Sequence, residues 1–306
     1  MRVSDYIANF LADYGIKHIF MVVGGYSMYL NDSIGKEERL ECIFNHHEQA
    51  SAMAAEGYAR VSNSLAVVCV TAGPGSVNAL NGVLGNYVDS VPVLYISGNV
   101  KRDISARNTD LRQMGDQEVD IISIVSPITK YAAYVDNPGQ IAFCLKEAIF
   151  QALSERRGPV WLDIPLDVQK TEMTTASEVL AMIKEAKNPL ILAGSAVRKD
   201  IELFHKLVDK LGVRVATAWN APDILESNHP LFAGRPDTLS GAPIDCDFLM
   251  VLGSRLNIRQ IGWETPFFVD IMVDIDQAEL DKHTLGVKTK IRADIVDFMG
   301  ELYEQL

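Results

Sequence analysis

The sequence predicts an α/β protein with two open, mainly parallel, doubly wound sheets and helices on both faces of each sheet. Short apolar runs of strand length alternate with stretches of helical spacing along the chain, and this alternation is typical of parallel sheets covered by helices. The length of 306 residues predicts two domains and is enough to bury one or two sizeable cores.

The N-terminal part of the chain is predicted to form the first sheet. Ser4 is a suitable N-cap for a helix in which Ile7 and Leu11 follow helical spacing, and Gly15 ends it. The apolar run 18–23 then predicts a buried strand. Further strands are predicted at 41–45, 65–71, 91–97 and 159–164, and helices from residue 26, at 49–61, after residue 75 and at 138–155.

A polar stretch at 101–116 interrupts the alternation and predicts a long exposed loop, which is a common position for function. We expect a first domain at 1–169, a linker at 170–180 and a second domain at 181–306, because the run 170–177 is polar. In the second part, strands are predicted at 189–193, 213–217, 248–252 and 271–274, and helices at 178–186, 199–211 and 295–306.

The charge balance limits the partners of the protein. Asp and Glu total 40 against 28 Lys and Arg, a net charge of −12, so the surface repels nucleic acid and anionic membranes. The apolar runs are far shorter than the roughly 20 residues that cross a bilayer, and no signal-peptide core follows Met1. We therefore expect a cytoplasmic protein that binds neither nucleic acid nor a membrane.

Glu48 is the sharpest local feature of the sequence. The segment 45–50 places its carboxylate where a predicted strand ends and an Ala-rich helix begins, at the edge where open α/β sheets bind ligands. Taken alone, Glu48 has a simpler interpretation as an N-terminal helix carboxylate stabilised by the macrodipole. His46 and His47 do not indicate a metal site, because adjacent strand residues point to opposite faces and no second cluster supplies ligands.

A glycine turn follows the predicted strand that ends at residue 71. Gly73 and Gly75 lie between this strand and the next helix, where backbone N–H groups could approach an anion or a polar ring. The turn half matches the dinucleotide fingerprint G-x-G-x-x-G, with Asp89 near the distance of a ribose contact, but Asn78 replaces the third glycine. An NAD-type ligand and a plain strand-to-helix turn both stay open. The sequence contains neither a P-loop nor a nucleophile elbow.

Several motifs occur together in a fixed order. They are Phe20-Met21-Val22-Val23-Gly24-Gly25, His46-His47-Glu48-Gln49-Ala50, Glu56-Gly57-Tyr58-Ala59-Arg60, Thr71-Ala72-Gly73-Pro74-Gly75-Ser76-Val77-Asn78, Asp89-Ser90-Val91-Pro92-Val93, Gln117-Glu118-Val119-Asp120, Pro127-Ile128-Thr129-Lys130 and Gly158-Pro159-Val160-Trp161-Leu162-Asp163-Ile164-Pro165. This set resembles the thiamine-diphosphate-dependent enzymes of the acetolactate synthase-like group, along the whole chain and most specifically at 15–169.

The resemblance implies a domain organisation. It identifies 1–169 as a pyrimidine-binding domain and 181–306 as a central Rossmann-like domain. The family's C-terminal diphosphate-binding domain, which binds Mg²⁺ through a Gly-Asp-Gly-Ser motif, is expected to be absent from the chain. Gly115-Asp116 is followed by Gln117 and does not match that motif.

The resemblance also implies roles for individual residues. Glu48 matches the glutamate that hydrogen-bonds the aminopyrimidine ring of thiamine diphosphate and favours the imino form, whose nitrogen takes the thiazolium C2 proton. The other matching positions are Gly24 and Gly25 in the loop beside this ring, Gly73 and Asn78 on the cofactor side of the pocket, and Gln117 on its substrate side.

Other matches are looser. Asp116 and Val23 stand where the synthases usually have Phe and Pro, so the resemblance implies the cofactor and leaves the substrate open. The segment 253–259 loosely resembles the flavin-contacting loop of some relatives, which makes FAD a further candidate cofactor.

The first functional hypothesis is an N-terminal part or a split subunit of a thiamine-diphosphate-dependent 2-oxo acid decarboxylase or carboligase, which is a carbon–carbon lyase or transferase. Because the family binds its cofactor between two subunits, the resemblance implies a homodimer or tetramer, or a separate diphosphate-binding subunit. The alternative is a non-catalytic α/β binding or scaffold protein derived from this family. The two hypotheses differ in whether activity depends on Glu48.

Overall fold

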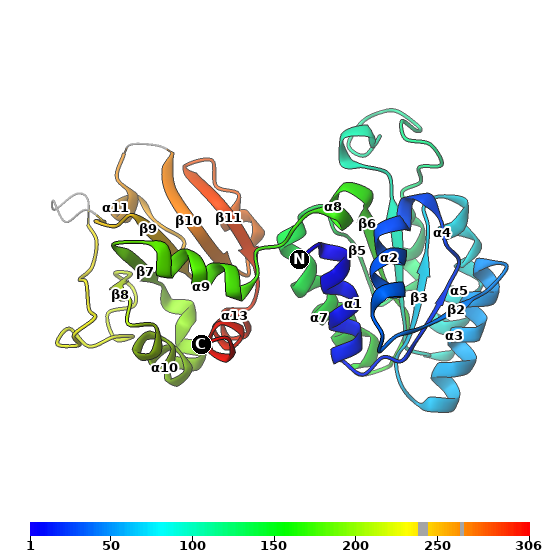
Figure 1. The fold of residues 1–306 in the computed structure, drawn as a ribbon. Coiled ribbons are helices and arrows are strands. Elements are labelled where there is room, and N and C mark those ends of the chain that lie inside the picture. Colours follow the sequence, from blue (N-terminus) through cyan, green and yellow to red (C-terminus); the bar gives the residue numbers. More distant parts are fainter. Residues whose placement is uncertain (238–243, 264–265) are drawn as a thin grey trace. The chain divides into compact units, whose positions relative to one another are not determined.

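The structure, a computed structural model, describes residues 1–237, 244–263 and 266–306. It forms two compact units, Met1–Met173 and Thr174–Leu306. Each unit contains an all-parallel sheet with helices around it (Figure 1). The predicted α/β class with doubly wound sheets is therefore confirmed.

The first unit contains six strands and eight α-helices. Its strands are β1 (His18–Met21), β2 (Glu41–Phe44), β3 (Ala66–Val70), β4 (Val93–Asn99), β5 (Tyr131–Tyr134) and β6 (Val160–Pro165). Its helices are α1 (Val3–Asp13), α2 (Met28–Lys36), α3 (Glu48–Ser62), α4 (Pro74–Asn78), α5 (Leu80–Asp89), α6 (Ile121–Val125), α7 (Ile141–Leu153) and α8 (Leu166–Lys170).

The strand order of this sheet is β2-β1-β3-β4-β6-β5. The chain crosses from β1 to β2 on one side and then returns to place β3 on the other side of β1. The connections after β1 and β3 therefore leave toward opposite faces of the sheet, which makes the gap between these two strands a topological switch point. Open α/β sheets bind ligands at such a point, outside the carboxyl ends of the strands.

Helices cover both faces of the first sheet (Figure 1). Residues of α1, α2, α7 and α8 share one core cluster, and residues of α3, α5 and α6 share another. Alternate residues of β3 belong to opposite clusters: Val67 and Cys69 to the first, Val68 and Val70 to the second. Every residue of β3 and β4 is buried, as expected for parallel strands between two helix layers.

The described residues of the second unit form a five-stranded sheet in the order β11-β10-β9-β7-β8. Its strands are β7 (Pro189–Ala193), β8 (Arg214–Thr217), β9 (Phe248–Leu252), β10 (Phe267–Asp274) and β11 (Leu285–Arg292). Its helices are α9 (Ala176–Glu185), α10 (Ile201–Leu211), α11 (Ile258–Ile261), α12 (Gln277–Leu280) and α13 (Ile295–Glu304). Core clusters lie on both faces of this sheet as well.

The predicted elements differ from the structure in two edge strands and in four short helices, α6, α8, α11 and α12, which were not predicted. β5 and β11 were not predicted; each ends its sheet, and most of their residues are only partly buried. The helix predicted after residue 75 is divided into α4 and α5. The predicted loop contains a short 3₁₀ turn at Arg102–Ile104 and no other helix or strand before α6. Within the described ranges, no helix is long and apolar enough to cross a membrane.

Candidate functional site

The carboxyl ends of four neighbouring strands carry most of the residues that the sequence singled out. These are Gly24 and Gly25 after β1, Glu48 after β2, Gly73 after β3 and Gln117 in the loop after β4. The strands lie side by side in the order β2-β1-β3-β4, so their loops meet at one edge of the sheet. The switch point between β1 and β3 lies at the middle of this edge.

Glu48 is the first residue of α3 and is only 9% exposed. The side-chain cap of this helix comes from His47, whose Nδ1 accepts a hydrogen bond of 3.2 Å from the backbone N–H of Gln49. The Glu48 carboxylate turns to α4 instead, where Oε2 accepts a hydrogen bond of 2.9 Å from Nδ2 of Asn78. The macrodipole of α3 favours a carboxylate here. Glu48 is thus a buried acid held at the ligand edge, and it is not the N-cap.

Two features require a glycine at position 73: its backbone conformation and the absence of room for a side chain. Its φ of 60° and ψ of −120° lie in a region that residues with a side chain rarely adopt. A Cβ atom at this position would lie 2.0 Å from the backbone oxygen of Gln117. The loop after β4 therefore packs its backbone directly against the turn after β3. Gln117 itself is exposed.

Thr71 was not among the predicted site residues, yet it lies close to several of them. A Cβ atom at Gly24 would lie 2.4 Å from Cβ of Thr71. A Cβ atom at Gly75 would lie 2.7 Å from Cγ2 of Thr71 and 3.2 Å from Oε1 of Glu48. The hydroxyl oxygen of Thr71 is buried and has no hydrogen-bond partner, which is unusual for a buried polar group. Its position directly before the glycine turn is the sequence signal that could have identified it.

The two glycines after β1 differ in what the structure requires. The Gly24 carbonyl accepts hydrogen bonds from Oγ of Ser27 at 3.2 Å and from Nδ2 of Asn31 at 3.4 Å, and Gly24 packs against Thr71 as described above. A Cβ atom at Gly25 would meet no atom within 4 Å. Close packing therefore explains a glycine at position 24, whereas nothing in the structure explains one at position 25.

The other ligand classes find little support in the geometry. His46 and His47 are exposed. Within residues 1–237, 244–263 and 266–306, no group of three or more His, Cys, Asp or Glu side chains could hold a metal ion. Asp89, the candidate ribose contact of an NAD-type site, forms an ion pair with Arg60 at 2.5 Å. The carboxylate that would recognise a ribose is therefore already engaged.

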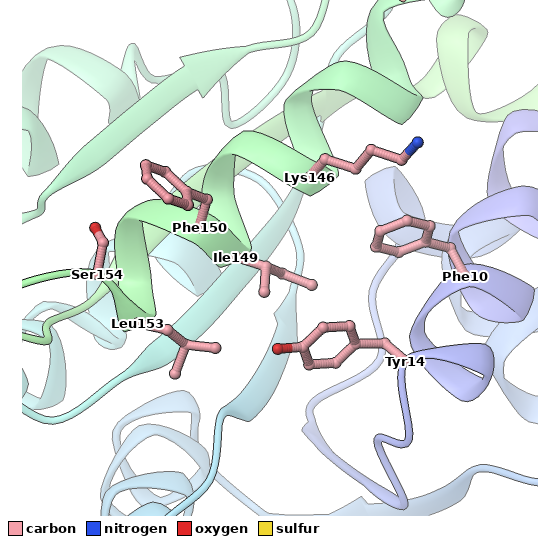
Figure 2. Close-up of a pocket in the computed structure, with 7 residues that line it drawn as sticks. All are labelled: Phe10, Tyr14, Lys146, Ile149, Phe150, Leu153 and Ser154. Atoms are coloured by element: carbon pink, nitrogen blue, oxygen red, sulfur yellow. The ribbon is translucent and has the colours of Figure 1, made fainter. Parts of the chain in front are cut away.

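A separate hollow of about 580 Å³ lies between α1 and α7 (Figure 2). It is on the face of the first sheet that α1, α2, α7 and α8 cover. Phe10 and Tyr14 face Ile149 and Leu153 across it. Its lining is mostly apolar and includes none of the residues at the switch point. The hollow is therefore distinct from the candidate site.

The fold and this edge define an α/β protein with a candidate ligand site at the switch point of its first sheet. Two family models match the chain. The N-terminal TPP binding domain of the thiamine pyrophosphate enzymes matches residues 1–124, and the central domain of the same enzymes matches residues 176–302. The chain therefore belongs to the thiamine pyrophosphate enzyme family, which confirms the resemblance seen in its motifs.

Similar curated proteins are acetolactate synthase large subunits. The chain is 30% identical to the acetolactate synthase large subunit of Lactococcus lactis subsp. lactis, over 91% of this chain and 53% of that protein. It is 31% identical to the acetolactate synthase isozyme 1 large subunit of Escherichia coli K12, over 98% of this chain and 57% of that protein. It is 28% identical to the probable acetolactate synthase large subunit of Methanocaldococcus jannaschii, over 96% of this chain and 53% of that protein. The chain thus spans about half the length of the curated relatives it matches.

Proposed function

We propose that the first unit supplies the pyrimidine-binding half of a thiamine diphosphate site in a 2-oxo acid decarboxylase or carboligase of the acetolactate synthase kind. The observation that carries this proposal is the buried Glu48 carboxylate, which Asn78 holds at 2.9 Å beside the switch point. The chain would then be the N-terminal part or a split subunit of a carbon–carbon lyase or transferase, with a 2-oxo acid as its substrate.

The residues present fit the aminopyrimidine side of this cofactor. Gly73 and Gly75 have no side chain in the turn after β3, and a Cβ atom at Gly75 would lie 3.2 Å from Oε1 of Glu48. The hydroxyl of Thr71 is a buried polar group that still lacks a partner at this point. A polar, flat ring could use both the bare turn and this hydroxyl. When bound, thiamine diphosphate supplies a nucleophilic thiazolium carbon and an electron sink for decarboxylation.

The role of Glu48 in this proposal is to hold a proton at a nitrogen of the aminopyrimidine ring. Its burial excludes water from that hydrogen bond and so strengthens it. Asn78 engages Oε2, which leaves Oε1 on the side of Gly75. We assign Gly24 and Gly73 to the cofactor pocket through their close backbone packing, and Gly25 only through the resemblance. Gln117, in the loop after β4, would face the substrate side.

The diphosphate group needs a second binding surface. We place it, with its Mg²⁺, outside the described residues, because the described ranges hold no cluster of acidic, His or Cys ligands for a metal ion. A further domain of a longer chain or another subunit would supply that surface, in a cytoplasmic homodimer or tetramer or in a complex with a separate diphosphate-binding subunit. FAD enters the proposal only through the loose resemblance of the segment 253–259, in which Arg255 and Arg259 are exposed.

The test is Glu48→Gln in the complete assembly. Gln keeps the size of the side chain but cannot transfer the proton, so exchange of the cofactor's C2 proton should slow by about a hundredfold or more. Glu38→Gln is the matched control, since Glu38 is an exposed glutamate of the same unit; it should exchange at the wild-type rate. Wild-type exchange in a folded Glu48→Gln protein would refute the role and favour a non-catalytic binding or scaffold protein.

A further inference from the structure

The carboxylate of Glu118 joins two separate segments of the long loop between β4 and α6. Its Oε1 accepts hydrogen bonds from Oγ of Ser105 at 2.5 Å and from the backbone N–H of Ala106 at 2.8 Å. Its Oε2 accepts hydrogen bonds from the backbone N–H groups of Met114 and Gly115, both at 3.1 Å. All four bonds converge on one side chain, so its removal would take away the anchor that the two segments share.

The loop depends on these bonds because its apolar side chains pack little. Ile104, Leu111 and Met114 are 40%, 57% and 50% exposed. Burial raises the pKa of Glu118, but the hydrogen bonds from Ser105 and from three backbone N–H groups hold that pKa below its ordinary value. The carboxylate is therefore ionised at neutral pH, and bonds to an ionised acceptor belong to the stronger class of hydrogen bonds.

The loop reaches the candidate cofactor site through Gln117, the residue directly before Glu118. The backbone oxygen of Gln117 lies 2.0 Å from where a Cβ atom of Gly73 would be. Gln117 has a φ of 56°, a left-handed conformation that is unfavourable for a residue with a Cβ atom and persists only where the surroundings impose it. Gly115 packs similarly closely, since a Cβ atom there would lie 2.6 Å from Cγ1 of Val100.

We propose that Glu118 is a positioning residue: by joining two segments of the loop, its carboxylate keeps the backbone of Gln117 seated against the Gly73 turn. The same turn contains Gly75, whose backbone lies close to the carboxylate of Glu48. Glu118 thus acts on the cofactor site through Gln117 and Gly73 without contacting the ligand. This inference rests on the proposed function, in which the Gly73 turn lines the thiamine diphosphate site.

The test compares Glu118→Gln with wild type in the complete assembly, by amide hydrogen exchange and by titration with thiamine diphosphate. Gln keeps one acceptor oxygen, but its NH2 group cannot accept, so one of the two pairs of donors loses its partner. Exchange in peptides covering 105–117 should therefore accelerate about tenfold or more. Exchange at 71–78 should accelerate about threefold, and the Kd for thiamine diphosphate should rise about threefold or more, since the turn is less well held.

Asp110→Asn is the matched control, because it removes the same charge from an exposed residue of the same loop. It should leave the exchange rates and the Kd at wild-type values. Glu118→Asp keeps the charge on a shorter side chain that cannot reach both segments, and it should give changes in the same direction as Glu118→Gln.

The inference is wrong if Glu118→Gln loosens 105–117 but leaves both the exchange at 71–78 and the Kd unchanged. A wild-type assembly that binds no thiamine diphosphate would refute the proposed function, whereas exchange at 71–78 would still decide whether Glu118 positions the turn.

If Glu118→Gln unfolds the unit, seen as fast exchange throughout β3 and β4, Ser105→Ala repeats the test. That variant removes one of the four donors and should accelerate exchange at both segments by a smaller factor; unchanged exchange at 71–78 would again overturn the inference.

Discussion

The side-chain amide of Asn78, at the end of α4, donates a hydrogen bond of 2.9 Å to the carboxylate of Glu48, at the start of α3. The two residues belong to the connections after β3 and β2, which are separated in the sheet by β1. The bond therefore joins two connections whose strands are not neighbours in the sheet. It orients one carboxylate oxygen toward α4 and leaves the other beside the glycine turn.

This hydrogen bond should be measurable as a coupling energy. Asn78→Ala and Glu48→Ala should each lower the free energy of unfolding, and the double variant should lose about 1 kcal/mol less than the sum, because the shared bond is lost only once. Urea unfolding of the four proteins gives this value. A coupling energy close to zero would show that the bond adds nothing to stability in solution.

Gly73 should not tolerate a side chain. Gly73→Ala should lower the free energy of unfolding by about 2–4 kcal/mol, because a Cβ atom would collide with the backbone of Gln117 and the backbone conformation is strained for alanine. Gly57→Ala is the control, because Gly57 lies inside α3 with nothing within 4 Å of the added Cβ. This variant should raise the free energy of unfolding by about 0.5–1 kcal/mol. Equal stability of Gly73→Ala and wild type in denaturant titrations would show that the turn relaxes without cost.

Thr71→Val should separate stability from ligand binding. Val has the shape of Thr without the unpartnered buried hydroxyl, so the ligand-free protein should be as stable as wild type or up to about 1 kcal/mol more stable. The affinity of the complete assembly for thiamine diphosphate should fall. Thr217→Val is the control, because its hydroxyl is also buried and unpartnered but lies in the second unit; its cofactor affinity should not change. An unchanged affinity in Thr71→Val would remove Thr71 from the site.

Asp163 should make stability depend on pH. This fully buried carboxyl in β6 accepts hydrogen bonds from Ser97 at 2.5 Å and from Asn99 at 2.6 Å. Burial raises the pKa of Asp163 from 3.8 to about 7, although these two hydrogen bonds act in the opposite direction. As the pH rises from the lower to the higher of these values, the unfolded chain loses this proton while the folded chain keeps it, so the protein loses stability.

Asp163→Asn lacks this titration. The free energy of unfolding of the variant, measured relative to wild type by denaturant titration, should rise between about pH 6 and pH 7 and become constant above about pH 8. The comparison with wild type cancels the titration of the other carboxylates. A difference that does not change from pH 6 to pH 8.5 would contradict the raised pKa.

Local patterns were enough to predict the fold class and the central strands. β3 and β4 are buried at every residue, and parallel strands between two helix layers appear in a sequence as continuous apolar runs. β5 and β11 were not predicted: both are edge strands whose residues are mostly only partly buried, and the sequence of β11 mixes apolar and charged residues where a central strand has a continuous apolar run. The sequence also placed Glu48 and Gly73 correctly at the carboxyl ends of strands, because a strand followed by a turn and a helix is a local feature.

The contacts of the candidate site were decided by the tertiary structure alone. The sequence could not show that Asn78 contacts Glu48, or that the hydroxyl of Thr71 is left unpartnered. Nor could it show that Gln117 packs on Gly73, since the two are brought together by adjacent strands that the order of the sheet selects. Residue type and spacing determine which elements form, whereas the partners of a side chain at the end of an element depend on which strands become neighbours.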